Sequence, residues 1–151
     1  MYIVPFHPDH LGEALYQGAS YGTLQDQNAF LEFTNRNNGG SIAFTAYSNN
    51  TILGMGGFIE LYPHLAEAWV IVLTNNNFST LKMARNILKL FSKVTEDYPK
   101  WERIQAAVRC DFHKGIRLVE FLGFENEGLM KKFGPDKSDY YRYAMVRNGP
   151  N

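Results

Sequence analysis

One continuous stretch, residues 66–94, most limits what this chain can fold into. It opens with a short apolar run rich in Val and Ile, residues 68–73, which is typical of a buried strand. From Ser79 onward the apolar residues recur at helical spacing, which predicts a long amphipathic helix. The first amides of a helix have no partner within the helix. A buried strand that runs into a helix therefore predicts an anion-binding junction, and we expect the functional site there.

Turn signals divide the rest of the chain into short strands and helices. The Asn-Asn pair at 49–50 predicts a tight hairpin, since Asn tolerates positive φ. Gly123 follows a helical pattern, in the position where helices often end. We expect strands at residues 2–6, 41–48, 51–62, 66–73, 103–108, 125–133 and 138–147, and helices at 9–16, 24–34, 79–96 and 113–122. No repeat or linker separates these elements, so we expect a single domain over residues 1–151.

Charge and cysteine content exclude several classes of partner. The 15 Lys and Arg residues balance the 15 Asp and Glu residues, so bulk charge does not favour nucleic acid. The single cysteine, Cys110, excludes an internal disulfide framework and a cysteine-based zinc site, and the scattered histidines lack metal-binding spacing. No apolar run approaches the roughly 20 residues of a transmembrane helix, and the N-terminus does not resemble a signal peptide. We expect a cytoplasmic protein without a nucleic-acid, membrane or metal partner.

The order of the expected elements, with two local segments, resembles the GNAT family of acyl-CoA-dependent N-acetyltransferases. The segment AEAWVIVL, residues 66–73, is similar to the family's fourth strand, and GIRLVEFLGFENEG, residues 115–128, is similar to its last helix and the Gly-Phe that follows. The resemblance implies an α+β (or α/β) fold with a mixed, mostly antiparallel sheet of six or seven strands and helices on both faces. It also implies transfer of an acetyl group from acetyl-CoA to a primary amine.

Glu67 is the general base that the resemblance implies, because some members of the family keep a carboxylate at the start of the fourth strand. Such a base removes a proton from the substrate ammonium, so that the amine can attack the thioester. At the edge of an apolar strand, we expect desolvation to raise the pKa of Glu67. The plain alternative is an exposed strand-end carboxylate or a pair with a lysine. Glu60 is the alternative base, and His64 would relay a proton, unless both are ordinary surface residues.

The resemblance also implies where acetyl-CoA binds. The strand backbone would pair with the pantetheine arm, the turn after it would hold the pyrophosphate, and the starts of two helices would contact the cofactor. The residues concerned are Val70, Ile71, Val72 and Leu73 on the strand, Asn75, Asn76, Asn77, Phe78, Ser79 and Thr80 in the turn, and Lys82 and His113 on the helices. The structural alternatives are an Asn-rich loop capped by Ser79, a solvated basic face around Lys82 and a surface position for His113.

The sequence departs from the family pattern in three places. The family's phosphate turn contains glycines, whereas this one has none, and Cβ atoms limit how closely a phosphate can approach. Phe112 stands where the family has an Asn, and Val119 stands where it has a general-acid Tyr. A tyrosine of the final strand (Tyr140, Tyr141 or Tyr143) would then serve as the acid, unless these residues are core or interface residues.

These departures favour a second hypothesis, a GNAT-like structural or interaction protein without catalysis. The chain from the central helix to the C-terminus also resembles, more weakly, the GNAT-like internal virion protein A of short-tailed phages. On this hypothesis the partner is a second copy of the chain, a host protein or a virion protein, and the protein is associated with the virion. On the first hypothesis the partners are acetyl-CoA and an amine acceptor, with a homodimer left open.

Overall fold

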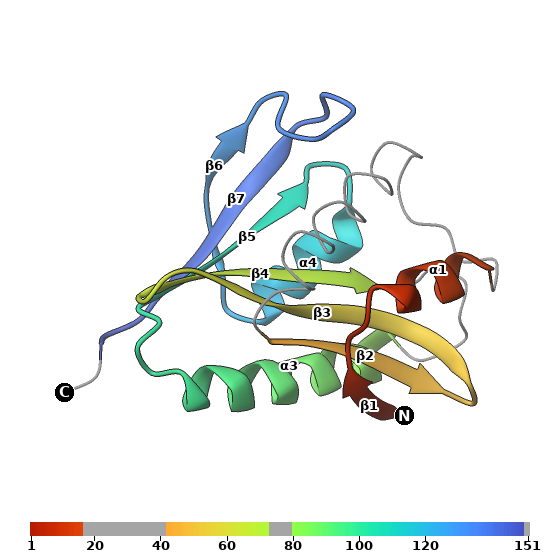
Figure 1. The fold of residues 1–151 in the computed structure, drawn as a ribbon. Coiled ribbons are helices and arrows are strands. Elements are labelled where there is room, and N and C mark those ends of the chain that lie inside the picture. The colour runs from red at the N-terminus through yellow and green to blue at the C-terminus, as the bar shows by residue number, and fades with distance from the viewer. Residues whose placement is uncertain (17–41, 73–79, 150–151) are drawn as a thin grey trace. The chain divides into compact units, whose positions relative to one another are not determined.

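The computed structural model describes residues 1–16, 42–72 and 80–149. Its elements are β1 (Tyr2–Pro5), α1 (Asp9–Tyr16), β2 (Ile42–Ser48), β3 (Thr51–Tyr62), β4 (Leu65–Val72), α3 (Thr80–Asp97), β5 (Arg103–Arg109), α4 (His113–Phe121), β6 (Glu125–Met130) and β7 (Tyr140–Val146) (Figure 1). The strands form one seven-stranded sheet in the order β1-β2-β3-β4-β5-β7-β6. This confirms the predicted α+β fold with a mixed, mostly antiparallel sheet. The helix expected at 24–34 lies outside the described residues.

The described residues fall into two compact units, and strands β3 and β4 contribute to both. The first unit contains residues 1–16, 42–59 and 68–72, and the second contains residues 60–67 and 80–149. Two expectations, a single domain and helices on both faces of the sheet, depend on how the two units are joined. Both stay predictions.

The first unit is an antiparallel arrangement of β1, β2 and β3 with α1. Strand β2 pairs with β1 on one side and with β3 on the other, and the turn between β2 and β3 has positive φ at Asn49 (50°) and Asn50 (63°). This confirms the predicted hairpin. The hydroxyl of Thr45, which is fully buried, lies 2.8 Å from Nδ1 of His10 and ties α1 to β2. A buried hydroxyl without such a partner would destabilise the fold.

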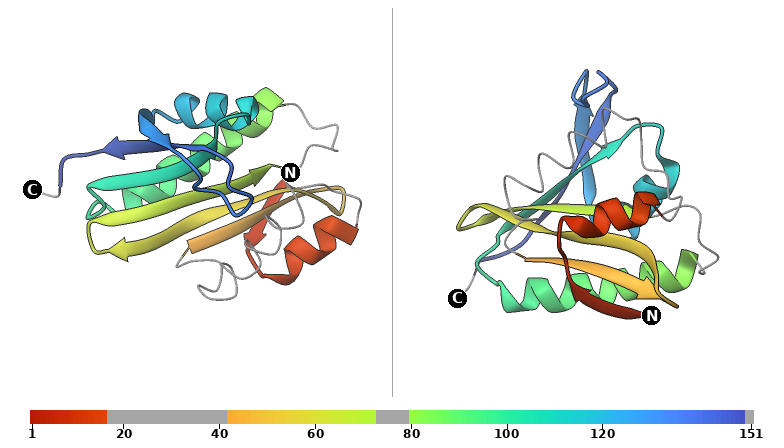
Figure 2. Two further views of the ribbon diagram at one scale, coloured as in Figure 1. Left: turned by 90° about the horizontal axis from the view of Figure 1, so that it is seen from above. Right: turned by 45° about the vertical axis from the view of Figure 1, so that its right-hand side comes forward.

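The second unit is built on β5, which lies between β4 and β7. Strand β5 is parallel to β4 and antiparallel to β7, and β6 pairs with the other side of β7. Helix α4 lies beside β5 (Figure 2), and Gly123 ends the helix region with φ of +100°, as predicted. The apolar core of this unit includes Phe91, Val94, Trp101, Ile104, Val119, Phe124 and Tyr143.

Trp101 joins several segments of the second unit. Its side chain is fully buried, and its ring stacks on Tyr98 with centroids 4.6 Å apart. The indole Nε1–H donates a hydrogen bond of 2.8 Å to Oε1 of Glu60, at the end of β3. Its backbone carbonyl accepts hydrogen bonds from Nε (2.9 Å) and Nη2 (2.6 Å) of Arg147.

The guanidinium of Arg147 binds the C-terminal end of α3. Nη1 donates to the carbonyl of Thr95 at 3.0 Å, and Nη2 donates to the carbonyl of Tyr98 at 2.9 Å. The last carbonyls of a helix have no partner within the helix, and a cation there also interacts favourably with the helix dipole. Burial lowers the pKa of Arg147. The arginine after β7 therefore holds α3 and the start of β5 together.

We expect Arg147→Met to lower the free energy of unfolding by about 2–4 kcal/mol, because it leaves several carbonyls without a charged donor. Arg147→Lys should recover only part of this loss, since an ammonium lacks the planar fork of the guanidinium. Urea unfolding monitored by circular dichroism measures both changes. The control is Arg117→Met, at an exposed position of α4, which should change stability by less than about 0.5 kcal/mol. Equal unfolding midpoints for Arg147→Met and the wild type would contradict the role of this guanidinium.

Candidate active site

Glu67 lies on β4 at the end of the described register with β5. The parallel register joins Leu65 to Arg103, Ala66 to Ile104 and Glu67 to Gln105. Ala66 is fully buried, and because side chains alternate along a strand, Glu67 points to the opposite face. Its side chain is 21% exposed. The candidate base is therefore a half-buried carboxylate at the point where the described pairing of β4 with β5 ends.

Two side chains from other strands hold the carboxylate of Glu67. Nε2 of Gln105, on β5, donates to Oε2 at 2.8 Å. Nη1 of Arg142, on β7, donates to Oε1 at 3.0 Å and to Oε2 at 3.2 Å. Glu67 is therefore not an exposed strand-end carboxylate, but it forms an ion pair, as the other alternative held, with an arginine in place of a lysine. Arg142 is 75 residues from Glu67 in sequence, so only the strand order brings them together.

A second ion pair continues this set of contacts across the sheet. Nε of Arg103 donates to Oε1 of Gln105 at 2.9 Å, and its two terminal nitrogens bind the carboxylate of Glu127 at 3.1 and 2.5 Å. The hydrogen bonding of Arg103 with Glu127 is the main cause that raises the pKa of Arg103 and lowers the pKa of Glu127. We call these five residues, Glu67, Arg103, Gln105, Glu127 and Arg142, the Glu67 network.

An irregularity in β6 allows Glu127 to join the network. The register of β6 with β7 shifts between Asn126 and Gly128, so Glu127 is an extra residue of a β-bulge. Gly128 has φ of +143°, a conformation that residues with a Cβ rarely adopt. No motif in the sequence marks this bulge. The glycine after Glu127 and the alternation of Arg103 with Gln105 on β5 were the only signals of the network.

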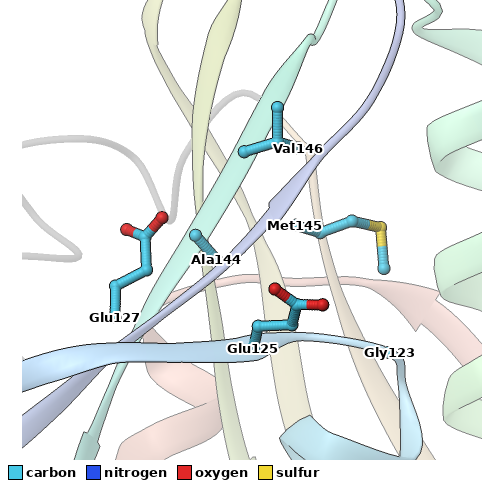
Figure 3. Close-up of a pocket in the computed structure, with 6 residues that line it drawn as sticks. All are labelled: Gly123, Glu125, Glu127, Ala144, Met145 and Val146. Carbon is cyan, nitrogen blue, oxygen red and sulfur yellow. The ribbon is translucent and has the colours of Figure 1, made fainter.

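Glu127 also lines a small open hollow on the second unit. The lining residues are Gly123, Glu125, Glu127, Ala144, Met145 and Val146. Figure 3 shows the carboxylates of Glu125 and Glu127 rising from β6 on either side of Ala144. The hollow is thus edged by two carboxylates, of which Glu127 is paired with Arg103. It adjoins the Glu67 network through that shared residue.

The second candidate base, Glu60, is held by structural contacts. Nζ of Lys100 lies 2.9 Å from its Oε1, and the indole of Trp101 donates to the same oxygen. These two hydrogen bonds, that of Lys100 first, lower the pKa of Glu60, and a lowered pKa weakens a general base. His64 is exposed and stacks on Tyr62. Of the three candidates for proton transfer, Glu67 is the one held by side chains from two neighbouring strands of the sheet.

The structure describes part of the predicted cofactor site. Val70 is 42% exposed and Ile71 is buried, while Val72 is described by its backbone in β4. Helix α3 begins at Thr80, one residue after the predicted start at Ser79, and Lys82 in its first turn is exposed. The remaining predicted residues, Leu73, Asn75, Asn76, Asn77, Phe78 and Ser79, lie outside the described residues.

The start of the last helix also matches its prediction. His113 is the first residue of α4 and is exposed, and Phe112 precedes it without a side-chain capping hydrogen bond. A Cβ on Gly115 would lie 2.8 Å from Cε2 of Phe112, so the ring packs directly on this glycine. Phe112, where the family has an Asn, thus forms an apolar contact at the entry of the helix.

Of the positions considered for a general acid, Val119 and Tyr143 are buried, whereas Tyr140 and Tyr141 are partly exposed. Val119 is a core residue of α4 and has no proton to donate. Tyr143 is only 2% exposed, and its hydroxyl donates to Oε1 of Glu120 at 3.0 Å. Burial first, and then the contact with Glu120, raise the pKa of Tyr143. Tyr143 therefore serves the core, which was the alternative interpretation of the final-strand tyrosines.

Within residues 1–16, 42–72 and 80–149, no group of three or more His, Cys, Asp or Glu side chains is placed to hold a metal ion. None of the helices described there is both long and apolar enough to cross a membrane.

Comparison with known proteins adds the fold family. No protein-family model and no curated protein matches the sequence. Among solved structures, Ard1 from Thermoplasma volcanium is 16% identical with a TM-score of 0.71, and the match covers 97% of each chain. RimL, a ribosomal L7/L12 alpha-N-protein acetyltransferase in complex with coenzyme A, is 17% identical with a TM-score of 0.71, over 98% of this chain and 94% of that one. A mutant of the spermidine N-acetyltransferase SpeG from Vibrio cholerae is 14% identical with a TM-score of 0.66, over 97% and 95%.

At sequence identities this low, the structural matches establish the fold only. The activity has to be argued from the residues of the site. The solved structures that resemble this chain are N-acetyltransferases. The chain therefore has the fold of the GNAT N-acetyltransferases.

The ion pair of Arg103 with Glu127 makes a testable prediction about protonation. Because the folded-state pKa of Glu127 lies below its unfolded value, the pair stabilises the fold above the unfolded pKa and loses this effect as the pH falls through the folded pKa. In Arg103→Gln, the pKa of Glu127 should rise toward the ordinary range of a glutamate. A carboxyl-carbon NMR titration measures this shift. Glu60 is the internal control, since its partner Lys100 is untouched, and an unchanged Glu127 titration would refute the assignment.

Proposed function

We propose that this protein is an N-acetyltransferase that uses acetyl-CoA to acetylate a primary amine in the cytoplasm, with Glu67 as its general base. The observation that carries the proposal is the half-buried carboxylate of Glu67, held by Gln105 and Arg142 at the point where the β4–β5 register ends. The fold shared with N-acetyltransferases supports the same reaction class.

The described residues are compatible with an acyl-CoA. Beyond Glu67, β4 continues to Val72, and its backbone would pair with the pantetheine arm. The 18-residue helix α3 begins soon afterwards, and its first amides suit an anion such as pyrophosphate. We propose the same role for the turn from Asn75 to Thr80 and for Lys82, with His113 as a further contact. Acetyl-CoA, when bound, would supply the acetyl group as an activated thioester.

The protein's own part in the reaction is to handle protons and to position the amine. Glu67 would take one proton from the substrate ammonium, and the freed lone pair would then attack the acetyl carbonyl carbon. The new N–C bond replaces the C–S bond. The nitrogen loses its second proton as the tetrahedral intermediate collapses, and this proton would reach the departing thiolate through water, because Val119 offers none. Gln105 and Arg142 restrict the rotamers of Glu67, so the carboxylate is oriented before the substrate arrives.

A second candidate is a GNAT-like structural or interaction protein. It is favoured by the burial of Val119, by the packing of Phe112 on Gly115, and by large apolar side chains that stand exposed on the second unit, such as Leu129 and Phe133. Exposed apolar side chains are typical of surfaces that bind another protein. Its partner would be a second copy of the chain or a host or virion protein.

We expect calorimetric titration to show micromolar binding of acetyl-CoA to both the wild type and Glu67→Gln, because Glu67 contacts the amine rather than the cofactor. Turnover with a responsive amine should fall about 10²- to 10⁴-fold in Glu67→Gln, the usual contribution of a general base. Glu60→Gln separates the two candidate bases, since it should retain turnover within a few-fold of the wild type.

Two results would overturn this proposal. Undiminished turnover of Glu67→Gln at neutral pH would remove the base assignment. Absence of acetyl-CoA binding at millimolar concentration would remove the reaction itself and favour the structural candidate, which would then be tested by solution mass and by capture of a partner.

A further inference from the structure

Arg142 presents an unused side of its guanidinium beside Glu67. The described contacts with Glu67 involve only Nη1, whereas a guanidinium has five N–H donors, which Nε and Nη2 share with Nη1. The side chain of Arg142 is 20% exposed and that of Glu67 is 21% exposed. A partly exposed cation, whose Nε and Nη2 have no hydrogen-bond partner among the described residues, and a partly exposed anion thus lie side by side.

The surroundings of this pair are nearly neutral and partly apolar. The other charged members of the Glu67 network, Arg103 and Glu127, are bound to each other, and Gln105 is neutral. The ring of Phe133 lies under the guanidinium, with Cζ of Arg142 5.8 Å from the ring centroid. Phe133 is itself 50% exposed. A ligand of this pair would therefore meet one positive group, one negative group and an apolar wall.

From this arrangement we propose that the acceptor amine is an α-amino acid with an apolar side chain. Its carboxylate binds the free donors of Arg142, its ammonium binds Glu67, and its side chain packs on Phe133. The two charged groups of an α-amino acid are attached to one carbon, so they match two protein groups in direct contact. This inference rests on the proposed function, since it identifies the substrate class of the same site.

Charge balance distinguishes an amino acid from a simple amine at this site. An amine alone would bring a second cation next to Arg142, and like charges in contact weaken binding. An amino acid adds one charge of each sign, so every charged group has an opposite partner. Its carboxylate uses donors of Arg142 that Glu67 does not contact, so the two anionic groups do not compete for the same N–H groups.

The test compares L-leucine with L-leucinamide, which keeps the side chain and the ammonium but lacks the negative charge. We expect the kcat/KM of the wild type to be at least about 10-fold higher for leucine, mainly through KM, because a charge-assisted bidentate contact is lost in the amide. In Arg142→Met this preference should disappear. The control is Arg109→Met, which removes an arginine bound to Asp111 and Asp136 and should keep the preference.

The outcomes separate this inference from the proposed function. Equal or better acetylation of leucinamide by the wild type, a result that needs no variant, would overturn the amino-acid inference and leave the N-acetyltransferase proposal intact. If no amine is acetylated, the proposed function fails, and direct binding decides the inference. Leucine binding seen by NMR that leucinamide does not share, and that Arg142→Met abolishes, would support the site, whereas no leucine binding at millimolar concentration would overturn it.

Discussion

The hydrogen bonds of the Arg147 guanidinium to the carbonyls of Thr95, Tyr98 and Trp101 are the constraint on which the second unit depends. They satisfy the open end of α3 and fix the chain that leads from this helix into β5. Strand β5 carries Arg103 and Gln105, so the position of the Glu67 network follows from this contact. A half-buried cation is stable here because several carbonyls replace the water that it loses.

The charged side chains of the Glu67 network, like Arg147, have polar partners that replace the water they lose. Each charged side chain has an opposite partner, Arg142 for Glu67 and Arg103 for Glu127, and Gln105 connects the two pairs. Partly buried charges are stable only when they are paired in this way. The arrangement orients Glu67 beside the guanidinium of Arg142. Orientation and selectivity would thus come from one set of contacts.

The site combines a retained architecture with altered local chemistry. The chain matches N-acetyltransferases of known structure over nearly its whole length at 13–17% identity. A sheet of this kind tolerates such divergence because its ladders are made by the backbone, while side chains need only preserve the apolar pattern. Val119 and Phe112 preserve apolar packing at positions where the resemblance implies polar groups. A reaction that depends on a well-placed base rather than on a protein acid is consistent with these residues.

The conformational preferences and apolar spacing of neighbouring residues determined where the helices, strands and turns lie. Asn49 and Asn50 specify a hairpin because both residues tolerate positive φ, Gly123 ends α4 for the same reason, and the apolar period of residues 80–97 specifies α3. Only the tertiary structure decided the partners of Glu67. The register of β5 with β7 and the bulge at Glu127 place Arg142 and Arg103 within reach. Long-range charge pairs depend on strand order and register, which no local pattern encodes, and this is why the sequence did not identify Arg142 as the partner of Glu67.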